Sequence, residues 1–139
     1  MTKVDREKIE KALDGLYGRV VLNIDGFKIT LVRGRISKNQ LGVVIYVNDE
    51  VKGEWLGSER DNPVQKFMRR SERFLLPAKE RASQKKFEKK YGKRRCRELG
   101  YRDPDAKYVC YLPYWSTGKA ALRHLIKVGE TVEIVEVIG

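Results

Sequence analysis

The sequence predicts a single α+β domain spanning residues 1–139, on the strength of three observations. Two runs rich in β-branched residues flank Asp25-Gly26, which favours an antiparallel hairpin near the start of the chain. Helical patterns bounded by proline and glycine occupy the middle, and a strand–helix–strand pattern closes the sequence. A chain of 139 residues can also bury a core without disulfides or metal ions.

An opening helix and a hairpin are predicted first. Over residues 4–17 the apolar side chains recur at helical spacing, and Thr2 or Asp5 can cap the helix. These apolar residues are Ile9, Ala12, Leu13, Leu16 and Tyr17. Residues 19–24 and 27–33 then predict two strands, with Asp25-Gly26 as a type I′ turn because glycine tolerates a positive φ.

A second hairpin is predicted after the first. Residues 41–47 are rich in β-branched side chains, and residues 51–56 follow the turn signal Asn48-Asp49-Glu50. The simplest arrangement is an antiparallel meander of about four strands.

The pattern becomes helical after Ser58. Pro63 opens a predicted helix that runs to about Leu75, and Pro77 separates it from a second helix over residues 78–91. A short helical turn over residues 93–99 ends at Gly100. The chain closes with a strand over 107–112, a helix over 117–127 capped by Ser116, and a strand over 131–138 that can return to the first sheet.

Positive charge is concentrated in the middle of the chain. The net charge is +11, and residues 58–107 hold 17 Lys and Arg against 8 Asp and Glu. The flanking regions are nearly balanced, with 10 against 8 in residues 1–57 and 3 against 3 in residues 108–139. We interpret residues 58–107 as a basic helical insertion within the domain, and such a surface attracts polyanions.

Twelve cations of this insertion are the candidate nucleic-acid-binding residues. A helix over 63–75 would gather four of them on one face, opposite an apolar face that can dock on the sheet. Arginine side chains can hold phosphate oxygens bidentately. In the next helix, lysines at i and i+4 repel one another, so an anionic ligand would relieve them. The residues are Lys66, Arg69, Arg70, Arg73, Lys85, Lys86, Lys89, Lys90, Lys93, Arg94, Arg95 and Arg97.

We therefore expect a noncatalytic protein that binds the phosphate backbone of DNA or RNA. The first alternative is an interaction protein or inhibitor that docks the same basic face on an acidic protein or a ribonucleoprotein. A compact basic chain of this kind fits accessory proteins of phages and mobile elements as a class. Five aromatic residues next to the insertion are candidates for stacking on bases or for packing in the core: Tyr101, Tyr108, Tyr111, Tyr114 and Trp115.

A second alternative is a small Mg²⁺-dependent nuclease. Asp25 together with Glu50-Val51-Lys52 is typical of nuclease sites in which two carboxylates bind the metal and a lysine helps to activate water. Turn chemistry explains both carboxylates equally well, and it is the interpretation we favour. We accordingly predict no catalytic residue, no metal site and no cofactor.

Two further features have ordinary structural explanations. Ser116-Thr117-Gly118-Lys119 lacks the first glycine and the final Ser or Thr of a phosphate-binding loop, because Pro113 and Ala120 stand at those positions. The helix that follows could still hold one phosphate at its N-terminus, but a helix cap is the simpler reading. His124, the only histidine, is expected to be a partly buried structural residue.

The sequence predicts a cytoplasmic protein with no membrane partner. No apolar run approaches the roughly 20 residues that cross a bilayer, and the N-terminus has no signal-peptide pattern. The two cysteines, Cys96 and Cys110, are too few for a disulfide framework and wrongly spaced for zinc, so both are predicted to be free thiols.

Overall fold

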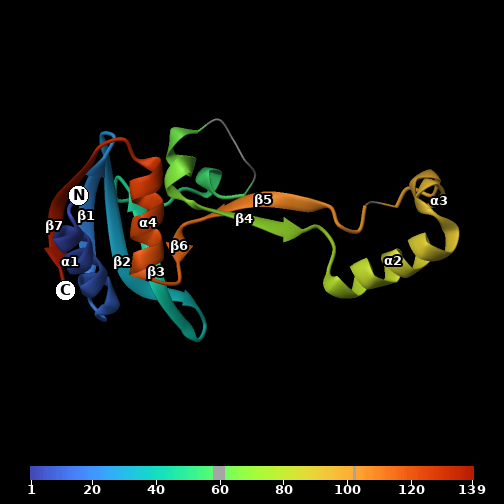
Figure 1. Ribbon diagram of the computed structural model, residues 1–139, viewed down its shortest axis with the longest axis horizontal. Helices are drawn as coiled ribbons and strands as arrows, with labels where there is room; N and C mark the ends of the chain where they lie inside the picture. The colour runs from blue at the N-terminus through green and yellow to red at the C-terminus, as the bar shows by residue number, and fades with distance from the viewer. Residues whose placement is uncertain (58–61, 102) are drawn as a thin grey trace. The chain divides into compact units, whose positions relative to one another are not determined.

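The computed structural model describes residues 1–57, 62–101 and 103–139, which form two compact units. The first unit comprises residues 1–70 and 111–139, and the second comprises residues 71–110. The predicted α+β class is confirmed (Figure 1). In sequence, the second unit falls inside the first and close to the insertion predicted over 58–107, although Ser58 itself lies outside the described residues. Within the described ranges, no helix is both long and apolar enough to cross a membrane.

A five-stranded antiparallel sheet, rather than one of about four strands, organises the first unit. Its strand order is β6-β3-β2-β1-β7. The predicted meander supplies the three central strands, and the C-terminal part of the chain supplies one strand at each edge. The strands are β1 (Arg19–Ile24), β2 (Phe27–Ser37), β3 (Gln40–Val47), β6 (Tyr114–Trp115) and β7 (Val132–Ile138).

Two helices, α1 (Lys3–Asp14) and α4 (Gly118–Val128), lie against each other and against this sheet (Figure 1). Alternate residues of the three central strands are fully buried, as the pleat requires when one face of a sheet packs on helices. This core comprises Val20, Leu22, Ile24, Ile29, Leu31, Val43, Ile45 and Val47 from the sheet, with Ile9, Leu13, Leu122 and Leu125 from the helices.

Local signals set both ends of α1. Thr2 and Asp5 form a reciprocal capping box, in which the Asp5 N–H donates to Thr2 Oγ1 and the Thr2 N–H donates to Asp5 Oδ2. The helix ends at Asp14, before Gly15, so Leu16 and Tyr17 fall outside it and are exposed. Their predicted place on the apolar stripe is therefore wrong. Arg33 of β2 donates to the Leu13 carbonyl oxygen at 3.3 Å, which holds the end of the helix on the sheet.

The predicted type I′ turn is confirmed, since Asp25 and Gly26 both have positive φ, at 51° and 84°. The second predicted turn also forms, because Val47 and Glu50 exchange two backbone hydrogen bonds. No strand follows it, however, and the predicted strand over 51–56 is wrong. That segment instead contains a 3₁₀ turn, η1 (Gly53–Trp55), whose Trp55 is buried and accepts a hydrogen bond from Gln65 Nε2 at its carbonyl oxygen.

The predicted helix over 63–75 is also wrong. Its first turn is a 3₁₀ helix, η2 (Pro63–Phe67), capped by Asn62, and the chain then extends as β4 (Arg69–Phe74). Phe67 and Met68 are fully buried, so the apolar residues that suggested a helical stripe anchor a single turn in the core. β4 pairs with β5 (Lys107–Leu112), and this distant partner supplies the hydrogen bonds that a helix would have made locally.

The remaining predicted elements of the middle segment form as expected. They are α2 (Ala78–Tyr91) and α3 (Lys93–Glu98), which contact each other within the second unit. Gly92, with a φ of 84°, separates them. In sequence, β4 begins in the first unit and ends in the second, and β5 begins in the second unit and ends in the first.

The glycine at the start of α4 allows close packing on α1. The cap of α4 is Thr117, whose Oγ1 accepts from the Ala120 N–H, and not the predicted Ser116. A Cβ atom on the buried Gly118 would lie 2.6 Å from Leu13 Cβ and 3.0 Å from Leu13 Cδ1. Packing against Leu13 therefore accounts for the glycine of the Gly118-Lys119 pair.

We predict that Gly118→Ala destabilises the chain by about 1–3 kcal/mol, because Leu13 is buried in a filled core and cannot yield. This cost exceeds the gain of up to about 1 kcal/mol that alanine brings to a helix. Urea unfolding measures the difference. Gly53→Ala is the matched control, since no atom lies within 4 Å of its added Cβ. Equal stability of the two variants would contradict the packing argument.

Candidate nucleic-acid interface

Charge divides unevenly between the two units. Residues 71–110 contain thirteen Lys and Arg against six Asp and Glu, a net charge of +7. The 99 residues of the first unit contain seventeen against thirteen, a net charge of +4. The basic character of the chain therefore belongs mainly to the second unit.

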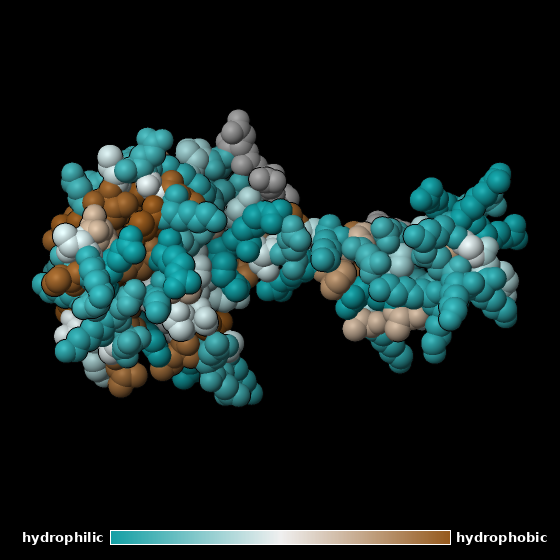
Figure 2. Space-filling model, in the orientation of Figure 1, coloured by the Kyte–Doolittle hydropathy of each residue, from teal (hydrophilic) through white to brown (hydrophobic). Residues whose placement is uncertain are grey.

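The second unit buries very little. Among its described residues only Cys96, Pro104 and Cys110 are buried, and α2 has no buried residue at all. Domains of about 40 residues normally need disulfides, metal ions or a partner to be stable. Both cysteines are free, as predicted, so no disulfide supplies this stability. In the view of Figure 2, hydrophobic patches lie over the first unit, whereas the surface of the second unit is predominantly hydrophilic.

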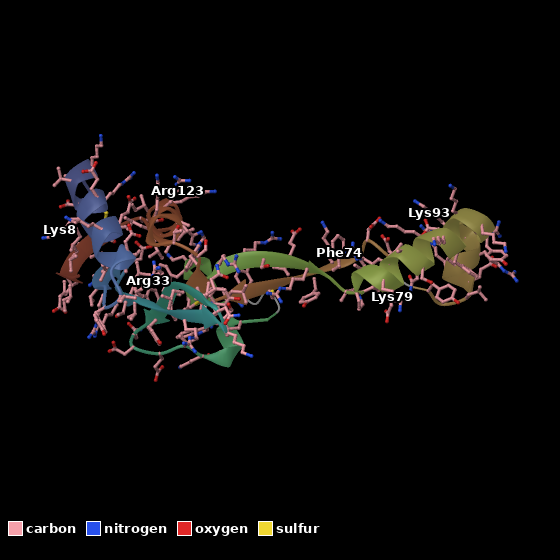
Figure 3. The ribbon with its side chains drawn as sticks, turned by 90° about the horizontal axis from the view of Figure 1, so that it is seen from below. Lys8, Arg33, Phe74, Lys79, Lys93 and Arg123 are labelled. Atoms are coloured by element: carbon pink, nitrogen blue, oxygen red, sulfur yellow. The ribbon has the colours of Figure 1, made fainter. Side chains whose placement is uncertain are left out.

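Helix α2 presents its lysines in two directions. The half-buried residues Arg81, Gln84 and Glu88 recur at helical spacing and define its inner side. Lys79, Lys86 and Lys90 recur at intervals of seven and four residues, which places them together on the outer side, where all three are exposed. Figure 3 labels Lys79 on this helix and Lys93 at the start of α3.

A second group of cations lines a cleft of about 600 Å³ between α2, α3 and the segment that follows α3. Two of its lysines have acidic partners: Lys85 Nζ lies 2.9 Å from Asp105, and Lys93 Nζ lies 3.8 Å from Glu88. Lys89 and Arg97 also line the cleft but form no ion pair with any residue that the structure describes. The cleft therefore has positive charge left for an anion.

The electrostatics of Asp105 reflect this excess of cations. The hydrogen bond from Lys85 lowers the pKa of the Asp105 carboxyl by more than desolvation raises it, and the positive charges of Lys85, Arg81 and Lys107 lower it further. Arg81 and Lys107 also lie over the ring of Phe74, with the Arg81 guanidinium carbon 3.6 Å and Lys107 Nζ 4.9 Å from its centroid. The cations around Asp105 thus create a positive electrostatic potential that stabilises its ionised carboxylate.

Three aromatic rings form a cluster beside the cleft. Phe87 lies at its centre, 4.5 Å from Tyr91 and 5.2 Å from Tyr101 between ring centroids. Tyr91 and Tyr101 remain 50% and 46% exposed. Both rings therefore offer apolar surface that a ligand can cover.

A helix-terminating motif fixes the backbone of Tyr101. Gly100 has a φ of 80° and donates to the Arg97 carbonyl, while the Tyr101 N–H donates across it to the Cys96 carbonyl at 3.0 Å. This is a Schellman motif, which ends α3 and turns the next side chain in a defined direction. Gly100 was the predicted end of this helix, but the sequence did not reveal that the turn places Tyr101 beside Phe87.

The structure separates the four cations that the predicted helix over 63–75 would have gathered. Lys66 lies in η2, where its Nζ forms an ion pair of 2.8 Å with Asp25. Side chains alternate along a strand, so Arg69 and Arg73 lie on one face of β4 and Arg70 lies on the opposite face. The guanidinium of Arg69 lies over the ring of Tyr114, at 5.2 Å. A strand repeats every two residues, so these side chains cannot form the single cationic face that was predicted.

The other eight predicted cations all lie in α2 and α3 of the second unit. Lys85, Lys89, Lys93 and Arg97 line the cleft, and Lys86 and Lys90 lie on the outer side of α2. Arg94 and Arg95 are exposed and lie 3.4 and 3.9 Å from the carboxylate of Glu98. Sequence reasoning missed Lys79, Arg81 and Tyr91, although the helical spacing of α2 could have identified the first two.

The five stacking candidates divide by unit. Tyr111 and Trp115 are buried in the first unit, and Tyr114 is half-buried beneath Arg69. Trp115 packs against His124, whose Nε2 lies 2.8 Å from the Lys66 carbonyl oxygen, so the histidine has a structural role. Tyr101 and Tyr108 are exposed in the second unit.

Asp25 and Glu50, the two carboxylates of the nuclease alternative, lie in or next to turns and contact neighbouring residues of the chain. Asp25 accepts hydrogen bonds from the Glu130 and Thr131 backbone N–H groups and from Thr131 Oγ1, in addition to its ion pair with Lys66. Glu50 lies 3.7 Å from Lys52. Across the described part of the chain, no three His, Cys, Asp or Glu side chains are grouped as metal ligands.

Comparisons with known protein families, with curated proteins and with solved structures find no match to this chain. The function must therefore be argued from the site itself.

We predict a pH-dependent effect of Asp25→Asn. The hydrogen bonds from Lys66, Thr131 and Glu130 hold the pKa of the Asp25 carboxyl far below its usual range. The folded state is thus favoured above the ordinary carboxyl pKa of about 4, and this contribution is lost as the pH falls toward the lowered value. The variant should melt below the wild type at pH 7, with a gap that narrows below about pH 4.

Thermal melts followed by circular dichroism between about pH 2 and pH 7 measure this gap. Glu54→Gln is the control, because Glu54 is exposed and forms no ion pair with the described residues. A gap for Asp25→Asn that stays constant with pH would contradict the role assigned to its charge.

Proposed function

We propose that the chain is a noncatalytic nucleic-acid-binding protein of the cytoplasm, and that its second unit binds the phosphate backbone. The observation that carries the proposal is the net charge of +7 on 40 residues that bury only three small side chains among those described. This combination stabilises a folded unit poorly and attracts polyanions strongly.

Bound phosphates would reduce the repulsion among the lysines of α2, most of which have no acidic partner among the described residues. Lys85 and Lys89, and likewise Lys86 and Lys90, are separated by four residues on one helix, where like charges cost a few tenths of a kcal/mol per pair. Only Lys85 among these four has an acidic partner among the described residues. A ligand that binds the folded unit stabilises it by mass action, so the unit should gain order on binding.

The distribution of the cations favours an extended ligand. They occupy both the outer side of α2 and the cleft, so no single small anion can reach all of them. A nucleic-acid backbone presents repeated phosphates that can follow such a surface, and these contacts carry no sequence information. We therefore propose binding with a steep dependence on salt and little dependence on sequence.

We predict that Lys86→Glu/Lys89→Glu/Arg97→Glu lowers affinity for a labelled oligonucleotide more than tenfold at about 50 mM salt. These three cations are exposed and form no ion pair with described residues. The slope of log affinity against log salt should become shallower by about 2, because three phosphate contacts are lost. Fluorescence anisotropy across about 50–300 mM salt measures both quantities.

The matched control is Lys8→Glu/Lys11→Glu/Lys127→Glu, which changes the net charge equally but alters exposed residues of the first unit. It should reduce affinity far less than the test variant. Equal losses would mean that net charge alone drives binding. Absence of binding by the wild type to any DNA or RNA at about 50 mM salt would overturn the proposal and favour an acidic protein as the partner.

A further inference from the structure

We infer that the second unit binds single-stranded rather than double-stranded nucleic acid, with an unpaired base stacked on Tyr101. This inference rests on the proposed function and names the class of ligand. Its basis is the aromatic cluster of Phe87, Tyr91 and Tyr101, which lies beside the cleft that also holds Lys89 and Arg97.

The geometry leaves a ring face of Tyr101 available. Its plane makes an angle of 72° with that of Phe87, an edge-to-face arrangement in which Phe87 can cover at most one face of the tyrosine. Tyr101 also lines the large cleft and a smaller adjoining hollow of about 130 Å³, together with Cys96 and Glu88. A flat ligand can therefore approach the ring from the cleft.

In the folded unit, backbone hydrogen bonds fix the position of Tyr101. The Schellman motif at Gly100 fixes where Tyr101 leaves α3, and the contact with Phe87 limits the directions that its ring can take. Once the unit is folded, stacking on this ring costs little further conformational entropy. Tyr91 offers a second exposed ring next to Phe87, although Lys90 Nζ lies 5.3 Å from its centroid.

The cleft also offers cations to the backbone of a stacked nucleotide. Lys89 and Arg97 line the same cleft as Tyr101 and have no ion pair with described residues, whereas Lys85 and Lys93 are paired with Asp105 and Glu88. An aromatic ring bordered by unneutralised cations is the arrangement that binds single strands, since every base has a face to stack. Bases in a duplex are already stacked on each other, so a duplex would leave the tyrosine unused.

The acidic residues of the cleft are part of the same argument. Glu88, Asp103 and Asp105 also line it, and they would repel phosphates placed beside them. The phosphates should therefore lie toward Lys89 and Arg97, and the base, which carries no charge, toward Tyr101.

The test compares a single-stranded oligonucleotide with a duplex hairpin of the same composition, using the full chain and anisotropy at several salt concentrations. We expect the single strand to bind at least tenfold more tightly. Tyr101→Leu keeps an apolar side chain against Phe87 but removes the ring. It should weaken single-strand binding about fivefold or more, with little change for the duplex.

Two features of the expected result separate stacking from charge and from loss of fold. Tyr101→Leu should leave the salt slope unchanged, because it removes no phosphate contact, whereas the triple charge reversal reduces that slope. Tyr101→Phe should bind the single strand as tightly as the wild type, since phenylalanine provides the same ring face. Tyr17→Leu, which alters an exposed tyrosine of the first unit, is the control and should have no effect.

The possible outcomes distinguish this inference from the function on which it rests. Equal affinity for single strand and duplex, with no effect of Tyr101→Leu, would overturn the single-strand inference while leaving backbone binding intact. Loss of binding in both Tyr101→Leu and Tyr101→Phe would also overturn it, because the ring would then not be what matters. Absence of binding to either oligonucleotide would overturn the proposed function as well.

Discussion

Repulsion among the cations of residues 71–110 is the constraint from which the character of the second unit follows. Apolar burial stabilises most domains, but the described part of this unit buries only Cys96, Pro104 and Cys110. The exposed ion pairs of Lys85 and Arg94 contribute little, because solvent screens them. Arg81 and Lys107 lie over the ring of Phe74, so positive charge also covers one of the few apolar side chains of this unit. The described contacts of the unit therefore supply little of the stability that a domain of this size needs.

The first unit has the opposite balance, because it holds most of the buried apolar residues and a smaller net charge. Its central strands and two helices share a fully buried core, and the edge strands β6 and β7 come from the segment that follows the second unit in sequence. The Asp25 carboxylate joins three parts of the chain, because it binds Lys66 of η2 and the backbone before β7. Regions of a protein can open with different free energies, so changes in α2 or α3 need not disturb this sheet.

Local chemistry made much of this fold predictable, and distant pairing limited the rest. Asp25-Gly26 specifies its turn through backbone conformation alone, and Pro77 and Gly92 bound α2 at the predicted residues. The helix over 63–75 was wrong because a short apolar cluster fits one buried 3₁₀ turn as well as a helical stripe, and nothing near β4 in sequence reveals β5 as its partner. Eight of the twelve predicted cations lie in α2 and α3, the two helices that were predicted correctly from local signals. The Tyr101 cluster could not be predicted, because it depends on a tertiary contact with Phe87.

The tyrosines show how topology decides which aromatic residues are left for a ligand. Tyr111, near the end of β5, and Trp115 of β6 belong to the first unit and are buried there. Tyr91 and Tyr101 lie in a unit that buries only three of its described residues, so both tyrosines remain about half exposed to water. Exposed aromatic rings cost free energy in water, and on a surface crowded with cations they are poorly suited to an apolar partner. A ligand that combines flat apolar rings with regularly spaced negative charge satisfies both features at once, and an unpaired nucleic-acid strand has that chemistry.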